Sequence, residues 1–408
     1  MKNGDKFISF AVAFQVIIQG CKNILVQGFP MLYNINNQLN IIIMGISLFL
    51  YVTALFYFKK QKTPIQAILI LLFVAFTYGF TYVFFPQNYV FIQNTILRTL
   101  ISCFFTFLLV SKLKTFDYLN IYFTGGSYLL TICGILYALI INIIGHTATS
   151  DWSTYSMTMS NVLLLSVMWQ LNKFFTTKDI LALTSSLLGF AIIFLYGSRN
   201  PLLAIITFIT ISILLGSNRS NNSNSKILKW VFIFLGLMFY LNFKGIINFI
   251  ASILEFFGLN SRTLYYITNA ETEDFSTGRN EIHDQLWDII CNNSFIGLGV
   301  SGDEVAIKEL AHSLYLSVFI TYGIFMGICV LIFIISLTIK GLKKAKGCDC
   351  NLIFMYACIV FPRSFTGGDI WANDYLWFLM GLVISSLYNR KKLLLNSRNL
   401  YEYKKIYK

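Results

Sequence analysis

The sequence contains few charged residues for its length. Of its 408 residues, 12 % are Asp, Glu, Lys or Arg and 56 % are hydrophobic, and the mean hydropathy is +0.67. Average globular domains carry about 25 % charged residues. The deficit excludes a cytosolic enzyme, a disordered chain and a nucleic-acid-binding protein whose basic side chains coat a folded surface. The net charge of +13 must instead be explained by membrane topology.

Paired cysteine motifs are also absent. The eight cysteines lie mostly inside apolar runs and have no paired spacing. This pattern indicates neither a disulfide framework nor a metal site. Cys348-x-Cys350 lies in a basic loop, where we expect two unpaired thiols on the cytosolic side of the membrane.

Long apolar runs fill most of the chain and predict an all-α, polytopic membrane protein. A membrane-spanning helix needs about 20 apolar residues. The first run is interrupted by Gln15, Gln19 and Lys22 and lacks a small-residue cleavage site, so we expect an anchor and not a removable signal peptide. The twelve expected spans are 7–28, 39–58, 65–85, 90–110, 121–145, 155–175, 180–197, 201–216, 227–250, 311–339, 351–362 and 370–389.

The distribution of cations predicts the orientation of these spans. Most Lys and Arg residues fall in alternate connections and in both termini, which the positive-inside rule places in the cytoplasm. Eight cations fall elsewhere and were not required by topology: Lys22, Arg98, Arg199, Lys244, Arg262, Arg279, Lys308 and Arg363. These eight are therefore candidates for a function at or near the outer face.

One connection, residues 251–310, is far longer than the others. It holds ten of the eighteen carboxylates and is expected on the external, or periplasmic, side. Loops longer than about 15 residues are usually functional or disordered. The spacing of Ile282, Leu286, Ile289 and Ile290 predicts an amphipathic helix lying on the outer leaflet. The chain thus divides into spans one to nine (1–250), this large loop (251–310), and spans ten to twelve with a basic cytoplasmic tail (311–408).

Arg199 precedes an expected helix start. In Ser198-Arg199-Asn200-Pro201, Asn200 suits the cap and Pro201 the first helical position, so free N–H groups would favour an anion there. The expected span 201–216 would be only about 24 Å long against about 30 Å of hydrocarbon. We therefore expect a recessed turn where a lipid pyrophosphate can dock. The alternative is an Arg that snorkels to lipid headgroups.

Arg279 and His283 lie one turn apart in the predicted loop helix and share a face with Leu286 and Ile290. The planar guanidinium of Arg279 suits phosphate oxygens. Alternatively, Arg279 pairs with a neighbouring surface carboxylate, where it would matter little. His283, taken alone, fits an interfacial residue as well as a substrate contact.

His312 precedes Ser313-Leu314 at the start of the tenth span. A helix N-terminus disfavours the imidazolium cation, so a neutral base at the outer surface is chemically reasonable. A His at a helix start can also be purely structural. The catalytic interpretation gains weight because Arg199, Arg279 and Arg363 are all predicted on the same side of the membrane.

Three further residues are candidate substrate contacts. Arg98 falls inside the fourth span, where an Arg at mid-bilayer costs about 2.5–3.5 kcal/mol, so it must face the bundle interior or a polar cavity. There it either pairs with a carboxylate or backbone carbonyls or contacts a lipid-linked substrate. Arg363 and Asp369, followed by Asp374, lie in the last external connection and could bind sugar hydroxyls.

The stretch Gly297-Leu-Gly299-Val-Ser-Gly302 matches the dinucleotide-binding pattern G-x-G-x-x-G. It follows no strand, no βαβ unit surrounds it, and it is predicted outside the cell, so we reject a dinucleotide site. The glycines are expected to allow a tight turn between the loop helix and His312.

These motifs, taken in order, resemble the O-antigen polymerase and O-antigen ligase superfamily. The resemblance covers about 130 residues by motif order, from Arg199 to Gly327, and the rest of the chain by topology. Ligases of the family commonly have Asn after the His, where this chain has Ser313. The residues that carry the resemblance are Arg199-x-x-x-Leu203, Gly278-Arg279, Trp287, Gly297-x-Gly299, Ala311-His312-Ser313-Leu314-Tyr315-Leu316 and Gly323-x-x-x-Gly327.

The resemblance implies a metal-independent, inverting glycosyltransferase of GT-C-like build, without a cofactor. It would use undecaprenyl pyrophosphate-linked oligosaccharides at the outer face of the bacterial inner (plasma) membrane, to make O-antigen, capsule or a similar surface polysaccharide. Carried over by position, Arg199 and Arg279 would hold the donor pyrophosphate and His312 would take a proton from the acceptor hydroxyl. The implied partners are the lipid-linked oligosaccharide, membrane lipids, a chain-length regulator and a flippase, and no nucleic acid.

Two alternatives to a polymerase remain open at this point. A ligase would move finished glycan to another acceptor. A lipid-linked oligosaccharide flippase or another transporter would share the composition and orientation, but it would be expected to carry charges in many spans and to have balanced halves. Here the polar residues concentrate in one external loop, which favours chemistry at the outer face.

Overall fold

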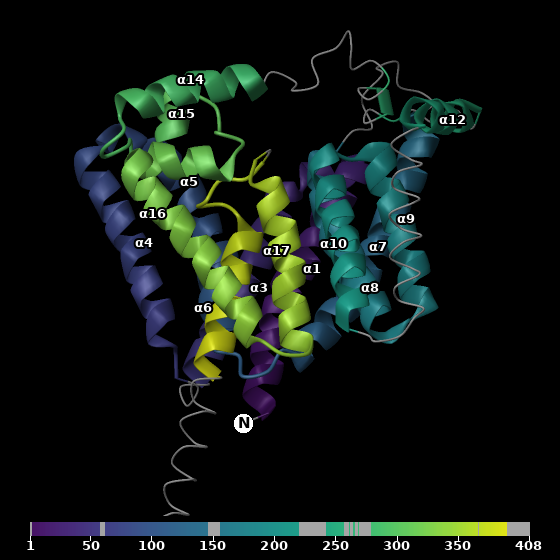
Figure 1. Ribbon diagram of the computed structural model, residues 1–408, viewed down its shortest axis with the longest axis horizontal. Coiled ribbons are helices and arrows are strands. Elements are labelled where there is room, and N and C mark those ends of the chain that lie inside the picture. Colours follow the sequence, from purple (N-terminus) through teal and green to yellow (C-terminus); the bar gives the residue numbers. More distant parts are fainter. Residues whose placement is uncertain are drawn as a thin grey trace, which may run out of the picture. The chain divides into compact units, whose positions relative to one another are not determined.

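The computed structural model describes residues 2–57, 62–145, 156–219, 242–256, 261, 264, 265, 268, 279–365 and 367–389, and every element in these ranges is a helix (Figure 1). The chain forms two compact units. Unit 1 comprises residues 1–18, 40–123 and 279–408, and unit 2 comprises residues 19–39 and 124–278.

Six helices within the described ranges are long and apolar enough to cross a membrane, which confirms a helical, multi-pass membrane protein. Three shorter apolar helices accompany them, so the number of twelve spans stays a prediction. The expected span 227–250 lies largely outside the described residues, and α12 (Phe243–Phe256) covers its end. The six long helices are Gly4–Gly28, Asn36–Phe56, Ile65–Phe84, Pro86–Ser111, Asp117–Ile141 and Leu314–Lys344.

Unit 1 contains the candidate site. The fourth expected span is not one regular helix, because a π-helical turn, η2 (Leu100–Phe105), joins α5 (Tyr89–Thr99) to α6 (Thr106–Ser111). Such turns occur frequently at functional sites. The other elements are the first parts of α1 (Lys2–Gly28) and α7 (Asp117–Gly145), most of α3 (Asn36–Tyr57), then α4 (Ile65–Phe84), η1 (Pro86–Asn88), α14 (Arg279–Asn292), α15 (Gly302–Ile307), α16 (Leu314–Lys344), α17 (Cys348–Arg363) and a helix over 374–389.

Hydrogen bonds join the helix ends of unit 1 into two groups, which match the alternation that the cation distribution predicts. At the end expected outside, Asn88 donates to the carbonyls of Leu298 and Val300 at 2.8 Å each, and Leu314 N donates to Ser364 O at 2.9 Å. At the opposite end, Lys114 N donates to Asp5 Oδ1 at 3.2 Å and Asn389 Nδ2 to Leu113 O at 2.9 Å. Connections that are alternate in the sequence therefore share one end of unit 1.

The glycine-rich stretch after α14 docks into a break in α16. Gly323 has φ 75° and ψ 172°, which interrupts the helix. The carbonyls of Ile320 and Thr321 accept hydrogen bonds from Leu298 N at 2.6 Å and Gly299 N at 3.2 Å. A broken membrane helix must have its freed backbone groups satisfied in this way. The glycines thus serve a close backbone approach, in line with the expected turn.

The loop helix predicted over 282–290 is α14, which lies with α15 across the N-terminal end of α16 (Figure 1). Its apolar side chains Leu286 and Ile290 are buried against Ala311, Leu316 and Ile320. This differs from the expected position on the outer leaflet, because the hydrophobic face that would have met lipid is already covered by α16. The packing fixes Arg279 and His283, on the same side of α14, close to the start of α16.

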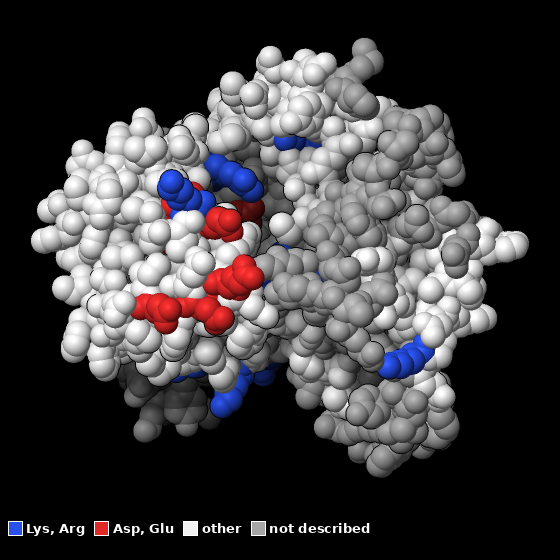
Figure 2. Space-filling view, turned by 90° about the horizontal axis from the view of Figure 1, so that it is seen from above, with Lys and Arg blue, Asp and Glu red and all other residues white. Residues whose placement is uncertain are grey.

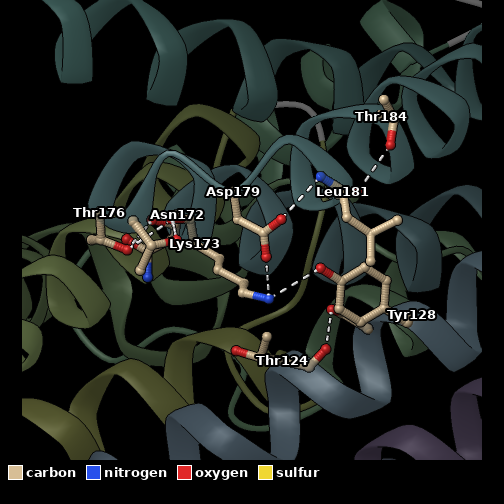
Figure 3. A network of polar contacts seen from close by, with 10 residues as sticks. Thr124, Tyr128, Asn172, Lys173, Thr176, Asp179, Leu181 and Thr184 are labelled. Carbon is tan, nitrogen blue, oxygen red and sulfur yellow. Dashed lines mark hydrogen bonds and ion pairs between the residues drawn. The ribbon is translucent and has the colours of Figure 1, made fainter.

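Unit 2 contains α2 (Pro30–Asn34), α8 (Met157–Thr177), α9 (Ile180–Tyr196), α10 (Arg199–Arg219) and α12, with the remaining parts of α1, α3 and α7. An ion pair closes the turn between α8 and α9: Lys173 Nζ lies 2.5 Å from Asp179 Oδ2 and also donates to Tyr128 OH at 3.3 Å (Figure 3). Asp179 Oδ1 in turn accepts from Leu181 N at 2.9 Å and caps α9. Lys173 therefore has a structural role at the end of unit 2 expected in the cytoplasm.

Candidate functional site

The candidate site is formed by α14, α15 and the chain that enters α16, all in unit 1. Acidic and basic side chains lie close together over this part of the face (Figure 2). The presence of both positive and negative side chains distinguishes this region from the apolar surfaces of the membrane-spanning helices. Three of the residues selected from the sequence, Arg279, His283 and His312, belong to this region.

Arg279, His283 and His312 converge although about thirty residues separate the first from the last. Arg279 is the first residue of α14 and is half-buried, as is His283 one turn later. The positive charge of Arg279 lowers the pKa of His312, and His283 adds a smaller effect of the same sign. The effect of one charge on another group's pKa falls off with distance, so the three side chains are neighbours.

His312 lies in a strained backbone segment between α15 and α16. Its φ is 48°, in the left-handed region that non-glycine residues rarely occupy. Ser301 and Lys308, with φ of 57° and 60°, share this conformation. Backbone strain of this kind clusters at active sites and ligand clamps, where the surrounding structure holds it. The imidazole is thus presented by a fixed, unusual turn and not by a regular helix.

The pKa of His312 is lowered, chiefly by burial and next by Arg279, against the opposing effects of Glu309 and Asp303. The sequence predicted a neutral imidazole because of a helix N-terminus. The cause is different, since His312 lies before Ser313, the N-cap residue of α16. A neutral imidazole at physiological pH can accept a proton.

His283 is a neighbour of His312 with a similar environment. Burial lowers the pKa of His283, whereas a hydrogen-bonding contact to the backbone of Ala311 raises it, and the net direction is downward. Ala311 directly precedes His312, so His283 supports the strained turn as well as lying beside the imidazole.

Asp303 belongs to the site and was not singled out from the sequence. Its side chain is 4 % exposed, and Oδ2 accepts a 2.7 Å hydrogen bond from Ala311 N. Burial raises the pKa of Asp303. In the sequence Asp303 is one of ten carboxylates in a long loop, and only its position after Gly302 distinguishes it. The fold alone shows that it holds the residue preceding His312.

Asp369 lies near Asp303. The Ser317 hydroxyl donates to Asp369 Oδ1, and Ala372 N donates to Oδ2 at 3.3 Å. Burial, with a contribution from Asp303, raises the pKa of Asp369 to about 6. Two carboxyl groups that share a site in this way hold a proton more tightly than either would alone. Asp369, predicted as a substrate contact, is therefore part of the same cluster as His312.

Arg363 and Arg98 have aromatic and acidic surroundings, respectively. The guanidinium of Arg363 lies over the Tyr375 ring, 5.2 Å from its centroid. Arg98 is exposed on α5 and acts electrostatically on Asp374, and its role as a substrate contact stays a prediction. Ser364, the residue after Arg363, accepts hydrogen bonds from Leu314 N at 2.9 Å and Ser313 Oγ at 3.2 Å, so the end of α17 lies beside the segment that carries His312.

Arg199 belongs to unit 2 and begins α10. The helix starts one residue before the expected cap Asn200, so Pro201 lies inside the first turn, where proline is tolerated. It contains 21 residues instead of 16, and at 1.5 Å per residue it is about 31 Å long. The apolar part, Arg199–Leu214, is nevertheless no longer than the expected span, so the recessed turn stays a prediction. The convergence of Arg199 with Arg279 stays a prediction.

No family model, curated protein or solved structure matches this chain. The resemblance to the O-antigen polymerase and ligase superfamily therefore rests on the quoted motifs. The chemistry of the site must carry the argument for function.

The site combines a guanidinium, two imidazoles with lowered pKa values and two neighbouring carboxyl groups. Among the described residues, no group of three or more His, Cys, Asp or Glu side chains is placed to hold a metal ion. The arrangement can bind an anionic group at Arg279 and accept a proton at His312. These are the two functions needed to transfer a group away from a phosphate.

Proposed function

We propose that the protein is a polymerase of lipid-linked oligosaccharide repeat units at the outer face of the bacterial inner (plasma) membrane. The observation that carries the proposal is the convergence of Arg279 with a half-buried, neutral His312 at the end of unit 1 predicted to lie outside. The resemblance of the motif order to the O-antigen polymerase and ligase superfamily gives the substrate class, undecaprenyl pyrophosphate-linked oligosaccharide.

The proposed reaction is a single displacement at the anomeric carbon of the donor. The acceptor hydroxyl oxygen forms the new glycosidic bond, and the bond from the anomeric carbon to the pyrophosphate breaks. Undecaprenyl pyrophosphate leaves with the electron pair, and the hydroxyl proton passes to His312. One displacement inverts the anomeric centre. The lipid phosphate already activates that carbon, so no nucleotide sugar is required.

Arg279 would act where negative charge develops. A guanidinium forms two parallel hydrogen bonds to phosphate oxygens, and charge grows on the leaving pyrophosphate as the bond breaks. Stabilisation of that charge lowers the free energy of the transition state more than the free energy of the bound substrate. We propose that Arg199 also binds a pyrophosphate group. Asp303 would act as a positioning residue, because it holds Ala311 beside His312.

A polymerase is favoured over a ligase because Ser313 occupies the position where ligases of the superfamily commonly have Asn. It is favoured over a transporter because the titrating groups concentrate around α14, α15 and the start of α16. A transporter would require polar groups to be distributed along the translocation path.

The test uses cells in which the native gene is replaced by variants produced at equal levels. Arg279→Ala and His312→Ala should each leave a single repeat unit attached to its acceptor, whereas Asp288→Asn, an exposed change on the same helix, should keep the full polymer length. Full polymer length with either site variant would contradict the proposal. Loss of single units from the outer surface would instead indicate a transporter.

A further inference from the structure

The break in α16 divides this helix into two parts, of which one alone has the length of a membrane span. All 31 residues of α16 would measure about 46 Å at 1.5 Å each, which exceeds the roughly 30 Å of hydrocarbon in a bilayer. The part after Gly323, residues 324–344, has 21 residues and measures about 32 Å. Its last turns carry the exposed Lys340, Lys343 and Lys344, which mark the predicted cytoplasmic boundary. The outer boundary of the hydrocarbon therefore falls close to Gly323.

The helix α4 places the outer boundary at the same level. It starts at the end of unit 1 expected in the cytoplasm, has 20 residues and measures about 30 Å, so its last residue, Phe84, lies at the outer boundary. Near this end, Thr81 Oγ1 accepts a 3.0 Å hydrogen bond from Val300 N. The backbones of Leu298 and Gly299 in turn donate to α16 just before its break. Two spans, each measured from its cytoplasmic end, therefore agree on one level.

The turn that follows α14 exposes two large apolar side chains at this level. Ser294 O accepts a 2.8 Å hydrogen bond from Ile324 N, which holds the turn against the break in α16. The next two side chains, Phe295 and Ile296, are 77 % and 62 % exposed. The ring centroid of Phe295 lies 5.1 Å from that of Phe325, which is 60 % exposed on the spanning part of α16. Phe295 therefore shares the surroundings of a side chain on a membrane span.

We propose that Phe295 and Ile296 form a membrane anchor, which inserts into the outer leaflet and contacts the acyl chains of its phospholipids. Large apolar side chains that are exposed at this depth are stabilised by lipid and not by water. The anchor continues the apolar surface of α16, on which further exposed side chains follow Phe325: Met326, Ile328, Ile332 and Phe333. A segment of the long connection expected outside thus enters the bilayer without crossing it.

The anchor sets the height of the candidate site above the bilayer. The nine residues before the break, Leu314–Tyr322, extend up to about 14 Å beyond the boundary. The turn that carries His312 therefore stands in the aqueous layer, at or above the lipid headgroups. The exposed carboxylates Asp284 and Asp288 on α14 require the same layer, because a charge in hydrocarbon is costly.

The experiment measures how fast single thiols react with a charged, water-soluble maleimide. The full-length protein is placed in phospholipid nanodiscs that each hold one copy, so that no second copy covers the anchor, and every cysteine peptide is quantified by mass spectrometry. Two native cysteines that are exposed in the structure serve as references. Cys291, one turn after Asp288 on α14, reports water, and Cys329, on the spanning part of α16, reports lipid.

Phe295→Cys and Ile296→Cys should react at least about ten-fold more slowly than Cys291, and at a rate close to that of Cys329. Lipid excludes the charged reagent and disfavours the thiolate, which is the reacting form. Asn292→Cys, exposed at the end of α14, is the matched control and should react like Cys291.

A second measurement separates cover by lipid from cover by protein. With p-benzoylphenylalanine in place of Phe295, irradiation should add the mass of one phospholipid to the peptide, whereas the same replacement at Asp288 should add none. Slow alkylation without a lipid adduct would overturn the anchor, as would alkylation of either new thiol at the rate of Cys291. Equal rates at Cys291 and Cys329 would place the boundary elsewhere and overturn it too. Neither readout involves turnover, so the outcome is independent of the proposed function.

Discussion

His312 combines a strained backbone with a lowered pKa, and each property has a separate origin in the fold. The strain comes from a left-handed φ of 48° in the turn before α16. The lowered pKa comes from burial and from Arg279. Both keep an uncharged imidazole at a fixed position, as a general base requires. The acid limb of the activity profile should therefore lie below the ordinary His pKa of about 6.5.

Changes to the charged neighbours of His312 should move this acid limb in opposite directions. Glu309 raises the pKa of His312 and Arg279 lowers it. Glu309→Gln should consequently shift the limb to lower pH, although salt screens the exposed Glu309 carboxylate. Arg279→Gln should shift the residual activity to higher pH. Initial elongation rates between pH 4.5 and 8 test this, and a common limb in wild type and both variants would refute His312 as the base.

Asp369 should destabilise the fold at neutral pH. Its folded-state pKa is raised to about 6, above the ordinary value of about 3.9. Below the pKa of the unfolded chain the carboxyl is protonated in both states, and the full stability of the fold is present. As the pH rises through about 6 the buried carboxyl must ionise, and that stability is lost. Asp369→Asn should therefore be more stable than wild type at pH 7, by about 1–3 kcal/mol, and the difference should shrink towards pH 4.5.

Thermal unfolding in detergent at pH 7 and pH 4.5 measures this effect. Asp288→Asn, on the exposed side of α14, is the control and should show no such pH-dependent gain. If Asp369→Asn were less stable than wild type at pH 7, the hydrogen bonds from Ser317 and Ala372 would outweigh the cost of the buried charge.

Residue type and spacing were sufficient to select Arg279, His283, His312 and Asp369 from the sequence. They were insufficient for Asp303, because ten carboxylates share the loop and only the docking of α15 buries this one. The distinction depends on burial and on a bond to the backbone of Ala311. Neither property has a sequence pattern of its own.

At the scale of elements, the break in α16 is the feature that positions the site. The carbonyl oxygen of Ser294 accepts a 2.8 Å hydrogen bond from Ile324 N beside Gly323, and a Cβ on Gly323 would lie 2.5 Å from that oxygen. The same break lets Leu298 and Gly299 bond to α16 and brings α14 and α15 onto its start. The helices themselves were predictable from apolar runs. The break at Gly323 was not predictable, because the spacing of glycines does not show which segment of backbone packs against them.

Gly323→Ala should destabilise unit 1 by about 3 kcal/mol or more, because the φ of 75° and the contact with Ser294 are both unfavourable for a side chain. Gly79→Ala in α4, where a Cβ meets nothing within 4 Å, is the matched control and should gain up to about 1 kcal/mol. Thermal unfolding monitored by circular dichroism compares the two. Equal stability of both variants would show that the break is not required.

The position of α14 also differed from expectation at this scale. Its amphipathic pattern predicted a helix correctly, but a hydrophobic face does not specify whether lipid or protein covers it. Here Leu286 and Ile290 meet α16. This packing orients Arg279 and His283 toward His312, an arrangement that a helix on the outer leaflet would not impose.

At the scale of the whole molecule, composition and cation distribution predicted a helical membrane protein, and the grouping of helix ends in unit 1 follows the predicted alternation. Hydropathy alone did not determine the number of spans, since several helices are short or interrupted. Six helices within the described ranges meet the requirement for crossing a membrane.

The most direct measurement of the central claim uses purified protein and lipid-linked repeat units in the presence of EDTA. The proposal predicts a ladder of elongated glycans, with one undecaprenyl pyrophosphate released for each bond formed. It also predicts loss of the ladder in His312→Ala and in Arg199→Ala, with Asp288→Asn unchanged. Wild-type protein that binds the lipid-linked unit but forms no ladder, or His312→Ala protein that forms a normal one, would contradict the account.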